Sequence, residues 1–467
     1  MTIVRKIKRK RRKIKRTFSI IKKSNLDVFN KIFRILSWLL PGLVLKRWIV
    51  TSAIGLITSL LGIAIWTNLR PLYWLIETFF WLMTGLTSIF PVSILGPFIF
   101  FIGLLLICLG QNRSINSIQK ALVPQKETLL VNALRVNSKL SRGPNIVAIG
   151  GGTGLSTLLK WLKNYSSNIS AIVTVTDDGG SSGILRKQLG VQPPGDIRNC
   201  LAALSNEEPT LTRLFQYRFS GGGELEGHSF GNLFLSALTT ITGSLEKAVQ
   251  ASSQVLSVQG QVIPATGTDV MLWAELEDGE KIFGESLIGK SVKPISRIGC
   301  LPENPPALKN AIDAIKEADL IVLGPGSLYT SLLPNLLVPE IVEELLKNNS
   351  PKIYISNLMT QPGETDGLDV YQHIKSIEKQ LFNFGVNTRI FNAILSQGEF
   401  EGSSLIDYYR SRGAEPVLCN KKRLVSEGYY VLQAPLFSKR ITPTLRHDSR
   451  RLARAVMYMY KKIKKAN

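Results

Sequence analysis

Cysteine and histidine are scarce in this sequence, which has four cysteines and three histidines in 467 residues. Cys108, Cys200, Cys300 and Cys419 lie far apart, and no two of them form a C-x-x-C pair. This distribution excludes a disulfide framework and a cysteine-based zinc site, and it is typical of a reducing compartment. The histidines are equally scattered and offer little material for a histidine-based metal site. No metal site is therefore predicted.

Two common catalytic signatures are also absent. The sequence contains no HExxH motif and no recognisable Ser–His–Asp spacing. Such motifs place a nucleophile, base or metal at fixed positions, so without them no residue can be assigned a catalytic role. Whether the protein is an enzyme stays open at this stage.

Acidic residues are almost missing from the N-terminus. Residues 1–47 hold sixteen Lys or Arg against one acid, Asp27, a net charge of +15, whereas the whole chain carries +23. Most of the excess charge is therefore a basic tail. A basic run beside a membrane span sets topology and contacts anionic lipid, which we favour, and RNA binding is the alternative. No specific nucleic-acid partner is predicted.

Long apolar stretches follow this tail. Residues 48–66 are uncharged and long enough to span a bilayer, and a second uncharged stretch covers 78–110. Positive charge on both flanks requires an even number of crossings. We therefore expect two transmembrane helices, at 48–66 and 93–110, with 71–90 at the outer interface, which makes 1–47 a cytoplasmic tail. The ligand domain would then face the cytoplasm from the inner membrane. A cleaved signal peptide is excluded because the basic region is too long.

From Pro144 onward, β-rich runs alternate with helical patterns, and glycine clusters sit at the strand ends. This alternation predicts an α/β domain over 144–450 with a parallel, doubly wound sheet. A linker or connecting helix over 111–143 precedes it, and a basic segment, 451–467, follows. The stretch 262–300 does not follow this alternation of strands and helices, and its Asp278-Gly279 pair predicts a small antiparallel hairpin.

A buried strand runs into the glycine turn 150–154, and a helix follows it. Such a turn lets backbone N–H groups approach an anion at a helix N-terminus. The next strand ends in Asp177 and Asp178, at about the distance where a dinucleotide fold places its ribose-binding acid. A purely structural glycine turn is the alternative.

Other polar segments also follow predicted strands, among them a second glycine loop at 324–327. In a parallel sheet these loops converge on one carboxyl edge, where open α/β folds bind ligands. The candidate ligand-binding residues are Gly150, Gly151, Gly152, Thr153, Gly154, Asp177, Asp178, Ser181, Asp196, Arg198, Asn199, His228, Asn232, Gly324, Gly326 and Ser327.

Several of these residues have an alternative structural role. Asp196 is equally well explained as the N-cap of the next helix, and His228 as a buried group rather than a base. Arg198 and Asn199 fall off the apolar face of that helix, which suits a phosphate or simple solvation.

Together the segments closely resemble the gluconeogenesis factor (YvcK-like) family, related to 2-phospho-L-lactate transferase. The matching stretches are GGGTG at 150–154, TDDGGSSG at 176–183, PPGDIRN at 193–199, GHSFGN at 227–232, GPGSLYTSLLPNL at 324–336, QPGETDG at 361–367 and RHD at 446–448. The resemblance covers about 145–450 and leaves 1–143 outside it. It implies a Rossmann-like three-layer fold that binds a nucleotide sugar such as UDP-N-acetylglucosamine. It also implies a role in carbon metabolism, cell shape and envelope-precursor supply.

Two other functions remain open. The related transferase joins a phospholactyl group from a nucleotide-activated donor to a flavin-like acceptor with a divalent metal such as Mg²⁺. That resemblance implies Asp177 or Asp178 near the acceptor or metal. A nicotinamide-dependent oxidoreductase is the third hypothesis, and the second glycine loop argues against it. The sequence leaves open whether the chain forms a homo-oligomer.

Overall fold

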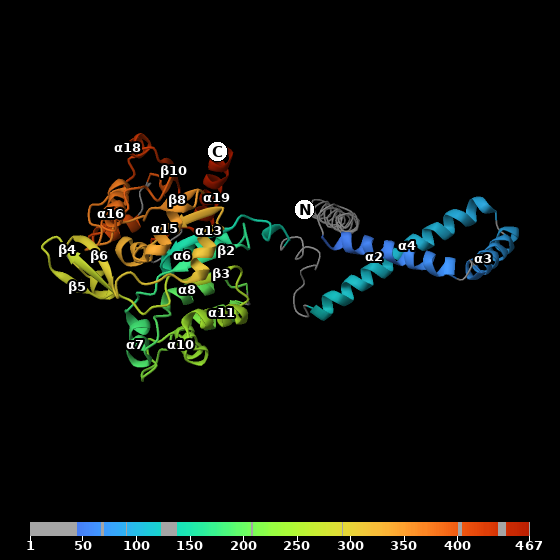
Figure 1. The fold of residues 1–467 in the computed structure, drawn as a ribbon, viewed down its shortest axis with the longest axis horizontal. Helices are drawn as coiled ribbons and strands as arrows, with labels where there is room; N and C mark the ends of the chain where they lie inside the picture. The colour runs from blue at the N-terminus through green and yellow to red at the C-terminus, as the bar shows by residue number, and fades with distance from the viewer. Residues whose placement is uncertain are drawn as a thin grey trace, which may run out of the picture. The chain divides into compact units, whose positions relative to one another are not determined.

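The computed structural model of the protein describes residues 44–66, 70–89, 91–122, 138–206, 209–291, 293–399, 404–437 and 445–466. The chain divides into two compact units, Met1–Ser138 and Lys139–Asn467. Helices make up the described part of the first unit, and the second unit holds the α/β fold (Figure 1).

The N-terminal unit contains α2 (Val44–Trp66), α3 (Arg70–Ile89) and α4 (Val92–Leu122). Large apolar side chains such as Trp66 and Trp81 are exposed on these helices. The apolar sequence is divided among three helices, and each also includes charged residues, for example Glu77 in α3. Among the described residues, no helix combines the length and the apolar character needed to cross a bilayer.

This finding contradicts the two transmembrane helices predicted at 48–66 and 93–110. For the segment 111–143, predicted as a linker or a connecting helix, residues 111–122 are helical and continue α4 from the apolar stretch. Residues 123–137 lie outside the described residues. Of the predicted basic tail 1–47, residues 44–47 begin α2, and residues 1–43 lie outside the described residues. The contact of this tail with anionic lipid, and the location of the ligand domain at an inner membrane, stay predictions.

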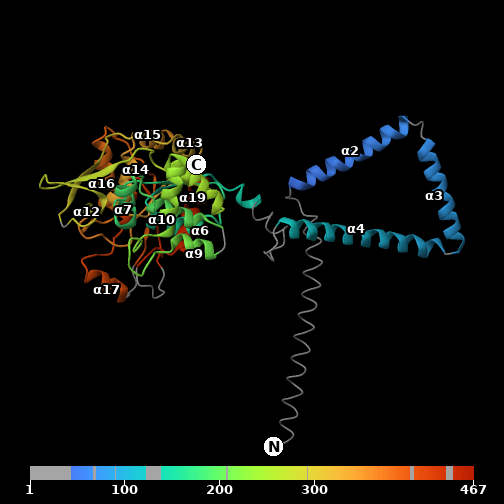
Figure 2. The same ribbon diagram turned by 90° about the horizontal axis from the view of Figure 1, so that it is seen from below.

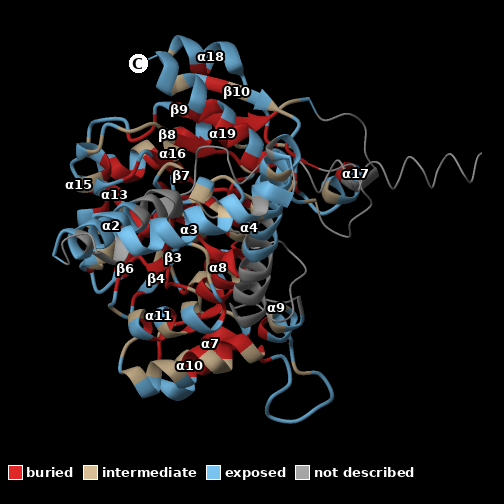
Figure 3. Ribbon diagram, turned by 90° about the vertical axis from the view of Figure 1, so that its right-hand side faces the viewer, coloured by how far each residue is buried: buried red, intermediate tan, exposed pale blue. Residues whose placement is uncertain are grey.

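The second unit is built on a seven-stranded parallel sheet with the order β10-β9-β8-β7-β1-β2-β3. Its strands are short and mostly apolar, as expected for strands covered on both faces. Buried residues run through them (Figure 3). The strands are β1 (Ile146–Gly150), β2 (Ile169–Val173), β3 (Gln261–Pro264), β7 (Leu320–Leu323), β8 (Lys352–Ile355), β9 (Ala393–Gln397) and β10 (Tyr430–Ala434).

Strand β1 lies at the point where the order of the strands reverses. Its Ile149 pairs with Ile172 of β2 on one side and with Leu323 of β7 on the other. This is the topological switch of a doubly wound fold, so the predicted parallel, Rossmann-like sheet is confirmed. Both glycine loops follow the two strands at the switch, and they therefore meet at the same edge, as predicted.

Helices cover both faces of the sheet. From the centre of the sheet, the connection from β1 to β2 runs in one direction and the connection from β7 to β8 runs in the other. Right-handed connections in opposite directions place their helices on opposite faces of a sheet, so α6 and α15 cover different faces. α6 packs against α8 and α19, and α13 packs against α15. Figure 2 shows α6 beside α19 and α13 beside α15. The helices are α6 (Gly152–Leu162), α7 (Gly180–Leu189), α8 (Gly195–Leu204), α9 (Pro209–Gln216), α10 (Phe230–Thr242), α11 (Leu245–Val255), α13 (Lys309–Lys316), α14 (Leu333–Leu336), α15 (Pro339–Lys347), α16 (Val370–Phe382), α17 (Ser404–Arg410), α18 (Lys421–Ser426) and α19 (Ser449–Ala466), with a π-helical turn at Leu328–Leu332.

The predicted antiparallel excursion is also present. It is a three-stranded sheet of β5 (Lys281–Phe283), β4 (Met271–Leu276) and β6 (Ile295–Leu301), and α12 (Glu285–Ile288) follows β5. Gly279 has a φ of 87°, which glycine adopts without strain, so the Asp278-Gly279 turn forms where it was predicted. Gln380 of α16 fixes the edge strand β6, because its amide side chain exchanges two hydrogen bonds with the backbone of Ile298, at 3.1 and 2.8 Å.

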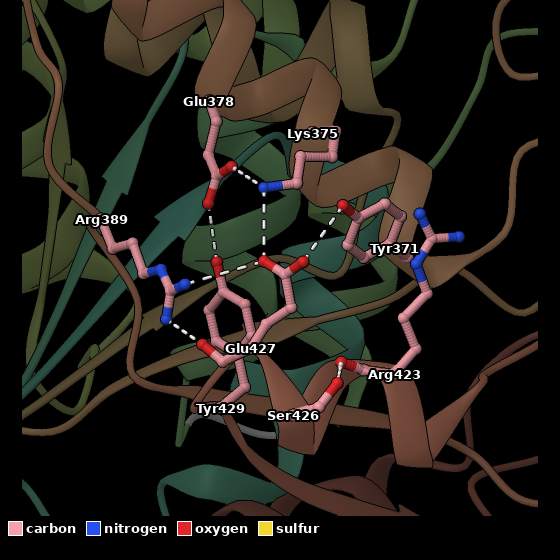
Figure 4. A network of polar contacts seen from close by, with 8 residues as sticks. All are labelled: Tyr371, Lys375, Glu378, Arg389, Arg423, Ser426, Glu427 and Tyr429. Carbon is pink, nitrogen blue, oxygen red and sulfur yellow. Dashed lines mark hydrogen bonds and ion pairs between the residues drawn. The ribbon is translucent and has the colours of Figure 1, made fainter.

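Polar contacts fasten α16 and α18 beside the edge strand β10 (Figure 4). Glu427 lies at their centre, where its carboxylate is 3.5 Å from the Lys375 ammonium and 3.7 Å from the Arg389 guanidinium. The Tyr429 hydroxyl donates a 2.7 Å hydrogen bond to Glu378. These groups are partly exposed, so the cluster fixes geometry more than it adds stability.

Glycines allow the loops at the switch point to approach one another closely. A Cβ atom on Gly152 would overlap the Cα of Asp196 at the start of α8, and one on Gly154 would overlap the carbonyl oxygen of Pro325 in the second glycine loop. A Cβ on Gly151 would lie 2.6 Å from the Ser331 hydroxyl. The glycine turn therefore serves backbone packing as well as any ligand.

Replacing Gly154 with alanine is expected to lower the free energy of unfolding by about 1–3 kcal/mol, because the added methyl group must displace backbone atoms. Urea denaturation of the full chain measures this loss. Gly398→Ala is the control, since a Cβ there would lie 3.9 Å from the nearest atoms, all of Ala434, at ordinary contact distance. Equal destabilisation by both substitutions would contradict the packing role of Gly154.

Candidate functional site

A cavity of about 620 Å³ opens at the carboxyl edge of the sheet, between the loops that follow β1, β2, β7 and β8. Open α/β folds bind ligands at this place, outside the topological switch point. Most of the predicted ligand-binding residues line it, namely Thr153, Gly154, Asp177, Ser181, Asp196, Arg198, Asn199, Asn232, Gly326 and Ser327.

Three helices begin at this cavity, and none of the three has a side-chain cap. The N-cap positions of α6, α7 and α8 are Gly151, Gly179 and Pro194, and none of these donates or accepts a capping hydrogen bond through a side chain. By contrast, Ser229 caps α10 through its hydroxyl. The positive ends of three helix dipoles thus face one space, which favours a bound anion.

Asp196 does not cap α8, so that alternative is wrong. It lies in the first turn, after the N-cap Pro194, and its carboxyl lines the cavity. Burial, followed by repulsion from Asp177, raises the pKa of Asp196 to about 7, although a hydrogen bond from the Gly152 N–H opposes the shift. Asp196 is therefore a buried carboxyl that changes charge near neutral pH.

Glu285 adds a third carboxyl to this space, after Asp177 and Asp196. It comes from α12 of the antiparallel excursion. Burial, followed by repulsion from the neighbouring carboxylates, Asp177 first among them, raises the pKa of Glu285 to about 8. The carboxyls therefore add negative charge to the cavity as the pH rises through 7 to 8.

Arginines supply the opposite charge. Arg198 is only 8% exposed, and its guanidinium donates hydrogen bonds to the hydroxyl of Ser229 and, at 2.8 Å, to the side-chain oxygen of Asn199. Its buried Nε has no hydrogen-bond partner and its guanidinium no ion pair among the described residues. Arg218 and Arg446 line the same cavity. A buried cation with an unused donor is suited to an anionic ligand, so the solvation alternative for Arg198 is wrong.

His228 lies behind the cavity wall. Its Nδ1 is 3.1 Å from the Ser181 hydroxyl, and Asn232 donates to that same hydroxyl, also at 3.1 Å. Ser181 and Asn232 line the cavity, whereas His228 does not. The structure thus favours the structural alternative for His228, which positions Ser181.

Asp178 also points away from the cavity. Its carboxylate accepts a 2.8 Å hydrogen bond from the Ser286 N–H and lies against Gly284, so it fastens the antiparallel excursion to the end of β2. Of the two adjacent aspartates, only Asp177 lines the cavity. Gly150, Gly151, Gly152 and Gly324 likewise form the backbone beneath it and are absent from its lining.

Several residues that line the cavity were not among the predicted ligand-binding residues. Among them, Glu285 and Arg218 reach the cavity only through the tertiary fold. Tyr409, which comes from α17, was not predicted either. Arg446 and His447 form the RHD motif, which could have been included. Burial lowers the pKa of His447 to about 4, and its Nε2 has no partner among the described residues.

Residues 284–291 match GxxxxGK[ST], the pattern of a phosphate-binding loop. In that loop a parallel strand precedes the glycines, and the helix begins near the lysine. Here α12 occupies the variable positions, and β5 is antiparallel. The match therefore does not form a phosphate-binding loop.

No group of three or more His, Cys, Asp or Glu side chains is arranged to hold a metal ion in the part of the chain that the structure describes. Mg²⁺ often binds through one or two carboxylates together with phosphates of the substrate. Asp177 and Asp196 are the residues that could serve it in this way.

Glu285→Gln is expected to raise the thermal midpoint of unfolding above that of the unmodified protein at pH 8, with no difference near pH 4. The folded state raises the pKa of Glu285 to about 8, so it binds more protons than the unfolded chain between the two pKa values. The unmodified protein therefore loses stability as the pH rises through this window. Thermal melts across pH 4–9 measure the difference, and a constant difference would contradict the shift.

Comparison with known proteins agrees with this geometry. The family model described as "2-phospho-L-lactate transferase CofD" matches residues 146–437. A putative gluconeogenesis factor from Nostoc is 50% identical over 423 residues, which cover 91% of this chain and 92% of that protein. That alignment is longer than the α/β unit, so the relative shares part of the N-terminal unit, which the resemblance had left out.

The gluconeogenesis factor of Bacillus subtilis is 44% identical and covers 69% of this chain and all of its own length. A crystal structure of a UPF0052 family member from Bacillus halodurans is 44% identical, with a TM-score of 0.64 over 68% of this chain and 99% of that one. The chain therefore belongs to the gluconeogenesis factor family, within the CofD group that is related to 2-phospho-L-lactate transferase.

Proposed function

We propose that this protein binds a nucleotide sugar of the UDP-N-acetylglucosamine type in the cavity at the carboxyl edge. The observation that carries the proposal is the meeting of three uncapped helix N-termini with the buried Arg198. A diphosphate matches this environment, because it can accept hydrogen bonds from several N–H groups and from the unused guanidinium donor.

The rest of the wall supplies groups for a ribose and a sugar. Carboxylates accept hydrogen bonds from hydroxyls, and Asp177 lies at the strand end where dinucleotide folds hold a ribose. Amide and hydroxyl side chains add further partners, and Gln361 is already fixed by a 2.7 Å hydrogen bond to Ser327. A cavity of about 620 Å³ is within the usual range for ligand pockets.

The proposed role is regulation rather than catalysis. Binding of the nucleotide sugar would report the supply of envelope precursors and adjust carbon metabolism and cell shape. The printed name of the relatives, gluconeogenesis factor, supports the link to carbon metabolism. The link to cell shape and precursor supply rests on the family resemblance.

A phospholactyl-type transferase is the second candidate, and the description of the matching family model favours it. For this function the geometry selects Asp177 over Asp178, because only Asp177 lines the cavity. Mg²⁺ would then bind between the carboxylates and the phosphates of a nucleotide-activated donor.

Calorimetric titration of the full chain with UDP-N-acetylglucosamine tests the first proposal. Arg218→Ala is expected to weaken binding by about tenfold or more, because it removes a cation from the wall. Arg213→Ala, on the exposed side of α9, removes the same charge nearby and should leave the affinity unchanged. Absence of binding to the unmodified chain at millimolar ligand would exclude the proposal.

Turnover of a nucleotide-activated phospholactyl donor with Mg²⁺ tests the second candidate. Asp177→Asn is expected to reduce kcat by about a hundredfold or more, because the carboxylate would contact the metal or the acceptor. Ser170→Ala, at a partly exposed position in β2, serves as the control. Turnover that survives Asp177→Asn would exclude the role of Asp177. If the unmodified chain shows no turnover, the regulatory function is favoured over the transferase.

A further inference from the structure

The C-terminal helix α19 has an unusual distribution of charge. Its sequence, SRRLARAVMYMYKKIKKA, holds seven Lys or Arg residues and no Asp or Glu. The apolar side is buried in the α/β unit through Leu452, Val456 and Met459, and the helix packs against α6 (Figure 2). The apolar side is therefore fully used by the fold, and only the basic side faces outward.

The exposed residues form a continuous stripe along the helix. Arg450, Arg454, Tyr458, Lys461 and Lys465 are exposed and follow one another at spacings of three or four residues, so they share one face. At 1.5 Å per residue this face extends for about 22 Å. Every other exposed residue of the helix is also cationic, except the terminal Ala466.

The protein neutralises little of this charge. Within the described residues, no ion pair involves α19. Arg450 lies over the Trp161 ring, 5.4 Å from its centroid, and Arg451 donates to the Phe437 carbonyl. By contrast, Arg454 and Lys461 make no hydrogen bond to the described residues. These two cations of the stripe therefore remain open to a partner.

Because only one face of α19 is exposed, its shape and charge indicate the kind of partner that it can bind. A flat anionic surface can meet the whole stripe at once. Clusters of four to eight Lys or Arg on an amphipathic helix are typical of segments that bind anionic lipid, each cation adding to the attraction.

We propose that the exposed face of α19 docks on the anionic surface of a lipid bilayer, with the cations of the stripe against the headgroups. The contact is electrostatic and requires no insertion, because the apolar side of the helix is already packed inside the protein. It needs no helix that crosses the bilayer. It is also separate from the ligand cavity, since no residue of α19 lines that cavity.

Lysine footprinting of the full chain tests the proposal directly. Vesicles that contain phosphatidylserine are expected to protect Lys461 and Lys465 from amine acetylation, whereas vesicles of phosphatidylcholine alone are not. Lys187 and Lys316, exposed on α7 and α13, should stay reactive with both. Because protection is read at each lysine, binding of vesicles by the N-terminal unit cannot produce the expected pattern. Sedimentation of the chain with the vesicles without protection of Lys461 and Lys465 would overturn the proposal.

A charge-removal series provides the second test. The triple variant R454Q/K461Q/K465Q is expected to weaken binding to phosphatidylserine vesicles by about tenfold or more, and high salt should weaken it similarly. Its matched control, K187Q/K247Q/K316Q, removes three exposed charges elsewhere and should bind like the unmodified chain. An equal loss in both variants, or a loss of affinity for RNA alone, would contradict a lipid-binding face. Unchanged thermal midpoints confirm that both variants fold.

Discussion

Close backbone contact at the carboxyl edge of the sheet is the constraint on which the site depends. The loop after β1 lies against the start of α8 and against the second glycine loop, at distances that leave no room for a Cβ on Gly152 or Gly154. These contacts hold the N-termini of α6 and α8 beside each other. Because α7 begins at the neighbouring strand end, the three helix dipoles add in one space.

Charge in the cavity is balanced between groups that favour an anion and groups that repel it. The helix N-termini and Arg198 attract negative charge, whereas Asp177, Asp196 and Glu285 oppose it. Burial raises the pKa values of Asp196 to about 7 and of Glu285 to about 8, so the balance changes near neutral pH. A ligand that brings both phosphates and hydroxyls satisfies both sets of groups, and the proposed nucleotide sugar is a ligand of this kind.

Two features of the molecule are independent of this cavity. The N-terminal helices expose large apolar side chains, and part of their sequence is shared with the Nostoc relative. The basic stripe on α19 belongs to the α/β unit, but the ligand cavity does not include it. The proposed ligand site and the proposed docking face therefore use separate residues of the chain.

The sequence by itself determined the parallel sheet, the two glycine loops at one edge and the hairpin at Asp278-Gly279, because strand periodicity and turn chemistry are local. Most of the candidate ligand-binding residues that it named line the cavity, although they make up a minority of the lining. The sequence could not distinguish Asp177 from Asp178, because Asp178 turns away from the cavity only once the antiparallel sheet packs against the end of β2. It also could not show that His228 lies behind the residues that line the cavity, where it contacts Ser181. Glu285 reaches the cavity from a separate sheet, so only the tertiary structure decided its place. The predicted division of the apolar N-terminal sequence into 48–66, 71–90 and 93–110 lies close to α2, α3 and the first part of α4. Only the structure decided against the bilayer crossings, because it gives where each helix begins and ends and which charged residues it includes.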